Sequence, residues 1–447
     1  MRTLLLSVFF VFLAASSSAQ DKCVTQILLQ QKLDANPEYV RIRQHQREYA
    51  RLGAETFSRK PQFKTTAVAK IPVVFHVVLT ESKINQLGGN SGVLQRAIDQ
   101  IAVLNEDFNR TNADNSKVPA PFASLSADLD IEFGLAHRKP DGSSTNGVEI
   151  QPTTVTSFSA LSNGGSDPKS TSTGGLDPWD PNRYLNIWIV DITENGVLGY
   201  TVPPSYMNLG YTLQELGLVL DYGCFGRRGG SINFFNPSTN DRGRTGTHEV
   251  AHFFELEHIF GLGSGCPSSG DSDDGIADTP PQNAPTYNAS FAGGVIPFPL
   301  TDVCSPNSPG IMWMNFMDYT DDASMYMFTQ GQAVFVYNQL TAGVLKSLTE
   351  HPELLDWPTG TADIDKEVRV EVFPNPSEGK IFVNFTDTDR PQTLHVVNAV
   401  GSVVKIIDVT DNSVTNYQLD LTPLSKGVYM IRCIFADGII TRKIVLQ

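Results

Sequence analysis

The segment HEVAHFFELEH, residues 248–258, constrains the fold of this chain more than any other feature, because three histidines and a glutamate recur in it at regular steps. His248 and His252 are four residues apart, and residues four apart lie on the same face of a helix. Two imidazoles can therefore reach one point from a single helical turn, and His258 can supply a third nitrogen. Three protein ligands that leave one position for water are typical of a catalytic zinc site, whereas a structural site uses four.

An ordinary core helix is the alternative interpretation, since the apolar residues of the segment could pack without a metal. The whole chain of 447 residues holds only 8 histidines, however, and three of them fall at these spacings. We therefore interpret His248, His252 and His258 as zinc ligands. Glu249 directly follows the first ligand and is predicted to be the general base, which takes a proton from a zinc-activated water and passes it to the leaving amine. A solvated surface carboxylate is the alternative for Glu249.

The N-terminus predicts an exported protein. Residues 1–19 carry Arg2, an apolar run from Leu4 to Ala15 and small residues suited to cleavage, as in a signal peptide. The run is too short to cross a bilayer as a permanent helix, so we expect no transmembrane segment in the mature protein. Residues 20–66 are polar and basic, and we expect them to form a detachable pro-segment.

Residues 67–350 are predicted to form one mixed α/β domain with an irregular C-terminal part. The apolar runs 71–79 and 184–192 predict buried strands, and SINFF (231–235) predicts a third, shorter strand. Apolar residues from Leu94 to Phe108 recur at steps of three and four, which predicts an amphipathic helix. After a linker at 351–366, residues 367–447 show short alternating runs that predict a small all-β sandwich of immunoglobulin-like type.

The formal net charge of −15 argues against a nucleic-acid partner, because phosphates would be repelled. Part of this charge lies in the loop GCPSSGDSDDGIADTPPQ, where carboxylates crowd together as in sites for a hard cation. A solvated acidic turn is the alternative. Cys266 and Cys304 flank the loop, and a disulfide between them would close it. Cys433 stands on an alternating apolar face and is predicted to be a buried thiol.

Two groups of motifs resemble known families. HEVAHFFELEH and NFMDY (315–319) are similar to the metzincin zinc peptidases, and GRTGTHEVAHFF, DGIADTPPQ and NFMDYTDDASMYMFTQGQ resemble their pappalysin-like branch, close to ulilysin-type enzymes. VFPNPSEGK, LSKGVYMI and the terminal KIVLQ resemble a type IX secretion sorting domain. The resemblance implies a metzincin fold with a mixed twisted sheet, protein or peptide substrates, and passage through the type IX secretion machinery of a Gram-negative bacterium. The product is then secreted or attached to the cell surface, and we expect a monomer.

The metzincin resemblance also implies roles for residues outside the histidine segment. Tyr319 would hydrogen-bond the oxyanion, Met317 would lie beneath the zinc ligands, and Asp273, Asp274 and Asp278 would bind calcium. Cys23 matches a cysteine of related pro-segments, which suggests a latency switch in which its thiolate occupies the open zinc position; an unpaired cysteine without this role is the alternative. Asp321 and Asp322 follow Tyr319 closely and could favour Arg or Lys after the scissile bond.

One departure from the family pattern lies at Glu255, where the family has glycine. Left-handed backbone is costly for other residues, by about 1–2 kcal/mol, so either the turn absorbs the strain or the chain takes a right-handed course. A catalytically silent binding or adhesion protein with the same fold is the rival function. Because the three histidines and Glu249 are all retained, the sequence favours a secreted zinc endopeptidase made as a zymogen.

Overall fold

The computed structural model describes residues 22–42, 44, 69–229, 232–261, 265–266, 274–356, 370–385, 390–391, 393–398, 403–409, 416–435 and 438–447. The predicted signal peptide and Asp273 lie outside these residues, as do parts of the predicted pro-segment and linker. No helix within the described ranges is long and apolar enough to span a membrane.

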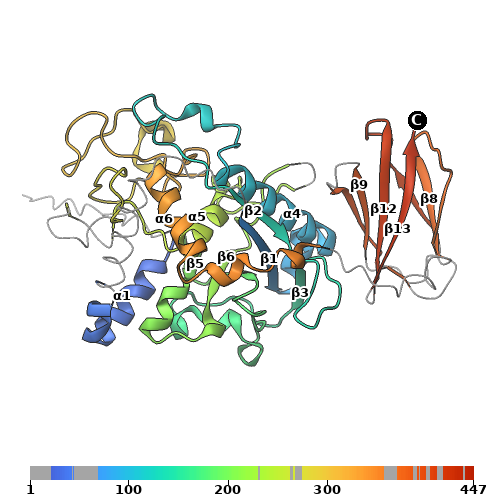
Figure 1. Ribbon diagram of the computed structural model, residues 1–447, viewed down its shortest axis with the longest axis horizontal. Helices are drawn as coiled ribbons and strands as arrows, with labels where there is room; N and C mark the ends of the chain where they lie inside the picture. The colour runs from blue at the N-terminus through green and yellow to red at the C-terminus, as the bar shows by residue number, and fades with distance from the viewer. Residues whose placement is uncertain are drawn as a thin grey trace, which may run out of the picture.

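A mixed sheet forms the centre of the N-terminal domain (Figure 1). Its strands run in the order β2-β1-β4-β6-β5, and β3 also pairs with β1. The strand β5 is antiparallel to β6 at one edge, whereas the other pairs are parallel. Burial of β1 and β4 explains their continuous apolar sequences. The strands are β1 (Ala69–Leu79), β2 (Ile131–Leu135), β3 (Val148–Pro152), β4 (Leu185–Val190), β5 (Gly199–Val202) and β6 (Gly217–Asp221).

The predicted helix is α4, and it packs against β2 and against α5, the helix of the histidine segment. Helix α5 in turn lies along β5 and β6, so the histidine helix runs beside the edge strand. Helix α1, which follows Cys23, buries Leu28, Leu29 and Leu33 in the same core. The α-helices that the structure describes in full are α1 (Thr25–Ala35), α3 (Glu81–Gln86), α4 (Gly89–Phe108), α5 (Arg244–Phe253) and α6 (Gln330–Thr341).

The described residues between α5 and α6 are mostly irregular, as the Gly-, Ser-, Asp- and Pro-rich composition predicts. The predicted disulfide between Cys266 and Cys304 is confirmed, with Cα atoms 5.0 Å apart. It ties the acidic loop to the segment that leads into NFMDY.

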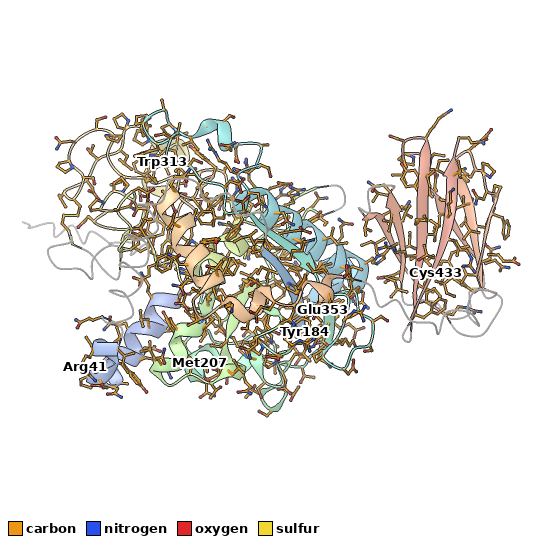
Figure 2. The ribbon with its side chains drawn as sticks, in the orientation of Figure 1. Arg41, Tyr184, Met207, Trp313, Glu353 and Cys433 are labelled. Carbon is orange, nitrogen blue, oxygen red and sulfur yellow. A yellow bond between two sulfur atoms is a disulfide. The ribbon has the colours of Figure 1, made fainter. Side chains whose placement is uncertain are left out.

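The C-terminal domain is the predicted β-sandwich. One sheet has the order β10-β9-β12-β13 and the other β11-β8-β7. Cys433 is completely buried between them, which confirms the predicted buried thiol (Figure 2). The strands are β7 (Val370–Phe373), β8 (Lys380–Phe385), β9 (Thr393–Asn398), β10 (Val403–Asp408), β11 (Asn416–Asp420), β12 (Gly427–Phe435) and β13 (Gly438–Leu446).

One predicted strand differs from the structure. The prediction of a strand at 231–235 is wrong, because Ile232 makes only an isolated bridge with Gly229 and residues 233–235 are not in a strand. The short 3-10 helix η10 (Pro352–Leu355), which lies at the start of the predicted linker, packs on β1. Its Leu354 is 1% exposed and accepts a hydrogen bond from the backbone N–H of His137.

Candidate zinc and catalytic site

The three predicted ligands converge on one point. The Nε2 atom of His258 lies 3.0 Å from Nε2 of His248 and 2.9 Å from Nε2 of His252. The Nδ1–H group of His248 donates to the Phe316 carbonyl at 2.7 Å, and that of His252 donates to the Leu256 carbonyl at 2.7 Å. These bonds fix the tautomers, so both rings direct an Nε2 lone pair into the shared space.

The three rings have the protonation state that metal binding requires. Burial lowers the pKa of His248 to about 4, and burial together with the neighbouring imidazoles holds the pKa values of His252 and His258 well below the usual value for histidine. The rings are therefore neutral at pH 7, which is the form that binds metals. Lone pairs that meet at about 3 Å repel one another, and the single proton of His258 cannot satisfy both neighbours. A divalent ion at the centre would remove this conflict, so the residues fit zinc.

The turn after α5 brings His258 to the other two rings. Glu255 adopts the left-handed conformation with φ 72°, so the turn keeps the geometry of a glycine and absorbs the strain. The backbone N–H of Leu256 donates to the Ala251 carbonyl at 3.0 Å and that of Glu255 donates to the His252 carbonyl at 2.9 Å. This is the pattern of a Schellman C-cap, which reverses the chain immediately after the helix.

Glu249 lies between α5 and the edge strand and is completely buried. Its Oε2 accepts a 2.7 Å hydrogen bond from the hydroxyl of Thr201 on β5. Its Oε1 has no hydrogen-bond partner. Burial raises the pKa of Glu249 to about 7, although hydrogen bonds from hydroxyl and thiol groups oppose the shift. Gly199 allows this approach, because a Cβ there would lie 2.9 Å from Cγ of Glu249.

Tyr319 and Met317 come from the NFMDY segment. The ring centroid of Tyr319 is 4.8 Å from that of His258, and its hydroxyl donates to the Cys23 carbonyl at 2.7 Å. Met317 is completely buried, and its carbonyl accepts a hydrogen bond from the N–H of Ile259, which directly follows the third ligand. The segment therefore reaches the site through both a side chain and the backbone.

The start of the predicted pro-segment runs through this site. Cys23 pairs with Gly199 of the edge strand in a parallel bridge, and its Sγ groups with the three histidine nitrogens within 4.8 Å. Among the described residues, this is the one set of three or more His, Cys, Asp or Glu side chains arranged to hold a metal. The Thr25 hydroxyl donates to Oε2 of Glu249 at 3.4 Å and accepts from the backbone N–H of Thr201 at 2.8 Å.

The two aspartates after Tyr319 lie in different surroundings. The Oδ1 atom of Asp321 pairs with Nζ of Lys22 at 2.8 Å. Asp322 is completely buried and accepts hydrogen bonds from the backbone N–H groups of Arg242 and Arg244 at 2.7 and 3.3 Å. Its carboxylate therefore holds the start of α5, whereas the carboxylate of Asp321 lies against the ammonium group of Lys22.

Asp274 and Asp278 also have roles in the folded loop. Asp274 accepts from the N–H of Ile276 and from the Thr279 hydroxyl. Asp278 accepts from the Thr329 hydroxyl at 2.7 Å and the Gly331 N–H at 2.8 Å, at the N-terminus of α6. The structure does not bring these two carboxylates together in one metal-binding group among the described residues.

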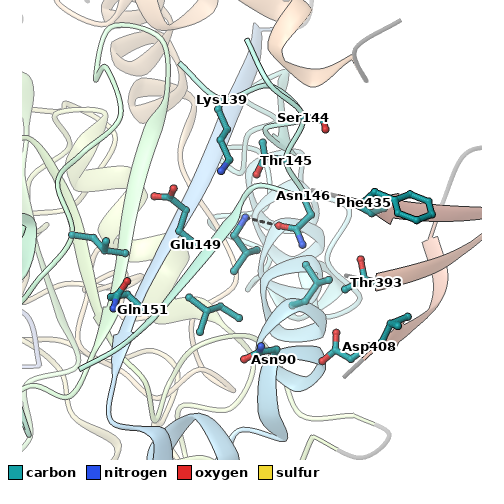
Figure 3. A pocket seen from close by; sticks show the side chains of 16 residues that line it. Asn90, Lys139, Ser144, Thr145, Asn146, Glu149, Gln151, Thr393, Asp408 and Phe435 are labelled. Atoms are coloured by element: carbon teal, nitrogen blue, oxygen red, sulfur yellow. Dashed lines mark hydrogen bonds between the residues drawn. The ribbon is translucent and has the colours of Figure 1, made fainter. Parts of the chain in front are cut away.

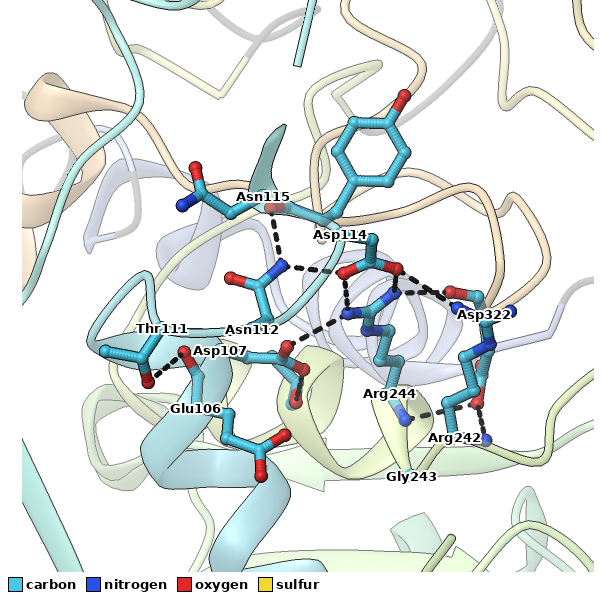
Figure 4. A network of polar contacts seen from close by, with 12 residues as sticks. Glu106, Asp107, Thr111, Asn112, Asp114, Asn115, Arg242, Gly243, Arg244 and Asp322 are labelled. Carbon is cyan, nitrogen blue, oxygen red and sulfur yellow. Dashed lines mark hydrogen bonds and ion pairs between the residues drawn. The ribbon is translucent and has the colours of Figure 1, made fainter. Parts of the chain in front are cut away.

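A buried charge network braces the N-terminus of α5 (Figure 4). The guanidinium of Arg244 donates to both carboxylate oxygens of Asp114, and to Asp107 at 3.3 Å. Asp107 also accepts from the hydroxyl of Thr247, which directly precedes His248. Sequence reasoning missed this network as well as Thr201 and Thr25, because each contact joins residues that are far apart in the chain.

A cavity of about 790 Å³ lies away from the histidines, where the sandwich faces α4 and β3 (Figure 3). Asn90, Lys139 and Glu149 line one side of it, and Thr393 and Asp408 line the other. It does not open onto any residue of the histidine site, so we place the chemistry at α5.

Histidines that converge from a helix and the turn after it, beside a mixed sheet, are typical of the metzincin class of metallopeptidases. Residues 173–341 match the family described as pregnancy-associated plasma protein-A, and residues 371–447 match the secretion system C-terminal sorting domain. A mutant of Tannerella forsythia promirolysin is 33% identical in a solved structure, covering 76% of this chain and 100% of that chain with a TM-score of 0.63. The chain belongs to the pappalysin family of peptidases.

Two further comparisons agree with this family. Mirolysin in complex with compound 9 is 38% identical and covers 65% of this chain and 100% of that chain, with a TM-score of 0.56. An extracellular metalloprotease of Pyricularia oryzae is 36% identical over 151 residues, 34% of this chain and 46% of that protein. The chain spans about half the length of the first curated relatives it matches. The sorting domain indicates export to the surface or the medium, as the sequence predicted.

Proposed function

We propose that this chain is a secreted zinc endopeptidase made as a latent precursor, with Glu249 as the general base. The observation that carries the proposal is the convergence of three neutral imidazoles on one point beside a buried carboxylate. The relationship to promirolysin and to extracellular metalloproteases supports the same activity. The rival, a silent binding protein, is not favoured, because the three histidines converge and Tyr319 packs against His258, while Glu249 is retained between the first two ligands.

His248, His252 and His258 would hold the zinc ion, which when bound supplies Lewis-acid activation of water and of the scissile carbonyl. Glu249 would take the proton of the attacking water on its unpaired Oε1 and deliver it to the leaving amine nitrogen. Thr201 donates to the other oxygen, so Oε1 would be the oxygen that accepts this proton. Tyr319 would donate to the carbonyl oxygen as it becomes negative; its hydroxyl already donates to a peptide carbonyl, that of Cys23.

Zinc content and peptide hydrolysis, measured on the same preparation, test the function. We expect one zinc ion per chain, loss of hydrolysis after chelation, and recovery when zinc is restored. A folded chain that cleaves peptides at the same rate without a transition metal would exclude the proposal.

We propose further that residues 22–25 keep the precursor latent. The thiol of Cys23 lies beside the ligand nitrogens. The Thr25 hydroxyl donates a hydrogen bond to the general base, Glu249, and the Cys23 carbonyl accepts the hydrogen bond of the Tyr319 hydroxyl. Burial and the Glu249 carboxylate raise the pKa of the Cys23 thiol, so its ionisation would depend on the charge of a bound cation. The segment would block the metal, the base and the oxyanion donor together.

Replacing Cys23 by alanine is expected to shorten the lag before peptide hydrolysis by about tenfold, since loss of about 1.4 kcal/mol of inhibitory binding has that effect. The lag is measured on the purified full chain. Cys433→Ala removes another buried thiol, within the sandwich, and should leave the lag unchanged. An unaltered lag in the Cys23 variant would show that latency does not depend on this thiol.

We propose that Asp321 favours Arg or Lys after the scissile bond. Lys22 lines a small cavity with Thr245 and His248, and its Nζ reaches Asp321, so this carboxylate already binds a basic side chain beside the metal ligands. Asp321→Asn should lower kcat/KM for peptides with Arg at that position by about tenfold, the range for a charge-assisted hydrogen bond. Exposed Asp141→Asn is the control. Equal loss on peptides with an apolar residue there would argue against a specificity role.

Calcium binding by the acidic loop stays a prediction from charge density, with Asp274 and Asp278 as the described candidates. Their hydrogen bonds to the loop and to α6 do not depend on an ion.

A further inference from the structure

Glu255 occupies the one position of the α5 C-cap where a side chain is disfavoured. Its φ of 72° is left-handed, and the hydrogen bonds of the turn are those of a Schellman motif. Glycine is the usual residue there, because any Cβ strains the backbone. A glutamate at such a position is tolerated when its side chain makes a contact that offsets the strain, and glycine has no side chain to make one.

The Glu255 carboxylate makes such a contact with Ser205. The backbone N–H of Ser205 donates to Oε1 at 2.8 Å, and the Ser205 hydroxyl donates to Oε2 at 2.6 Å. Ser205 is 7% exposed and Glu255 is partly exposed, so the pair lies at the edge of the core. Ser205 lies in the 3-10 helix η5 (Pro204–Leu209), which follows the edge strand β5. The carboxylate thus links the turn after α5 to the segment that follows β5, the strand whose Thr201 donates to Glu249.

The position of this turn controls two of the three histidines. The Leu256 carbonyl, one residue after Glu255, accepts the 2.7 Å hydrogen bond that orients His252. His258 follows two residues later. Unlike the other two ligands, His258 has no hydrogen-bond partner on Nδ1 in the described structure. Its ring stacks on Phe260 at a centroid distance of 4.6 Å, so its placement depends on packing and on the course of the backbone.

We propose that Glu255 and Ser205 form a clamp that positions His258, and with it the Leu256 carbonyl, for metal binding. Glu255 is a positioning residue that acts through the turn and does not contact the reacting atoms. The inference rests on the proposed zinc site. It implies that glycine at residue 255 relieves backbone strain but loosens the third ligand, so that metal retention falls although the fold survives.

Release of zinc into an excess of chelator, followed on the purified full chain, tests the clamp. Glu255→Gly should release zinc about tenfold faster than the natural chain, the lower end of the effect of removing an interaction that orients a ligand. Glu255→Gln keeps one acceptor oxygen and should fall between the two. Ser205→Ala should also accelerate release, and the double variant should be no faster than Glu255→Gly alone, because the two residues act as one unit.

Asp130→Gly is the matched control, because Asp130 is another non-glycine residue with positive φ (52°), in the segment just before β2. Its replacement relieves the same kind of strain and should not change zinc release. The cobalt-substituted chain gives a second readout, since looser coordination alters the visible absorption bands. Release from Glu255→Gly within twofold of the natural chain, with unchanged cobalt spectra, would overturn the clamp. A natural chain that binds no zinc would instead refute the proposed function, so the two failures are distinguishable.

Discussion

Glu249→Gln is expected to lower kcat for peptide hydrolysis by about 10²- to 10⁴-fold, the range that general acid–base catalysis supplies. Glutamine has nearly the same shape, so Thr201 can still donate to its oxygen, but it cannot accept a proton from water at neutral pH. Zinc content should stay at one per chain, because all three imidazoles remain. The measurement combines kcat, zinc analysis and the unfolding midpoint on the same protein.

A matched control separates chemistry from folding in this experiment. Glu132 has a side chain that is 50% exposed on β2, and Glu132→Gln should leave kcat, zinc content and stability unchanged. Retention of more than one tenth of the natural kcat by Glu249→Gln would assign the proton transfer to another group. Loss of zinc together with activity would instead show that Glu249 supports the metal site and leave its role as base unproven.

The sequence predicted the parts of the fold whose signals are local. Strands β1 and β4 are continuous apolar runs, α4 has a clear helical period, and the histidine spacing fixes α5. The edge strand β5 was missed because GYTV is only four residues long and pairs antiparallel with β6 through contacts that no local pattern encodes. SINFF was wrongly predicted as a strand because its apolar residues give a strand-like local pattern. In the structure Ile232 makes only one bridge, with Gly229, so no ladder of backbone hydrogen bonds forms.

The candidate site shows the same division. The ligands, Glu249, Tyr319 and Cys23 carry signals in motifs, and the structure brings them together. Thr201 carries none, since its hydroxyl reaches Glu249 across 48 positions of sequence. Asp322 illustrates how one carboxylate can have two plausible roles: its place after Tyr319 favours substrate binding, whereas its complete burial against the backbone of Arg242 and Arg244 gives it a structural one.

Arg244 is the first residue of α5 and pairs with Asp107 and Asp114. Its positive charge is needed at any pH at which these two carboxylates are ionised. Burial raises the pKa of Asp107 to about 7 although Arg244 opposes the shift. For Asp114, burial is outweighed by the hydrogen bonds and charge of Arg244, and the pKa is lowered. Without Arg244 both folded-state pKa values would rise. The folded variant would then bind more protons than the natural folded protein, so its relative stability must fall as pH increases.

Arg244→Met is therefore expected to reduce the free energy of unfolding of the peptidase domain by about 3–5 kcal/mol at pH 8, the cost of leaving a buried charge without its partner. The deficit should shrink at pH 5, where protonation of Asp107 removes part of the uncompensated charge. Denaturant unfolding at both pH values measures this. Arg227→Met removes a pair with Glu106 in which both side chains are 39% exposed, and it should cost no more than about 1 kcal/mol. An equal, pH-independent loss in the two variants would mean that the network contributes through packing alone, and that the N-terminus of α5 does not depend on the charge of Arg244.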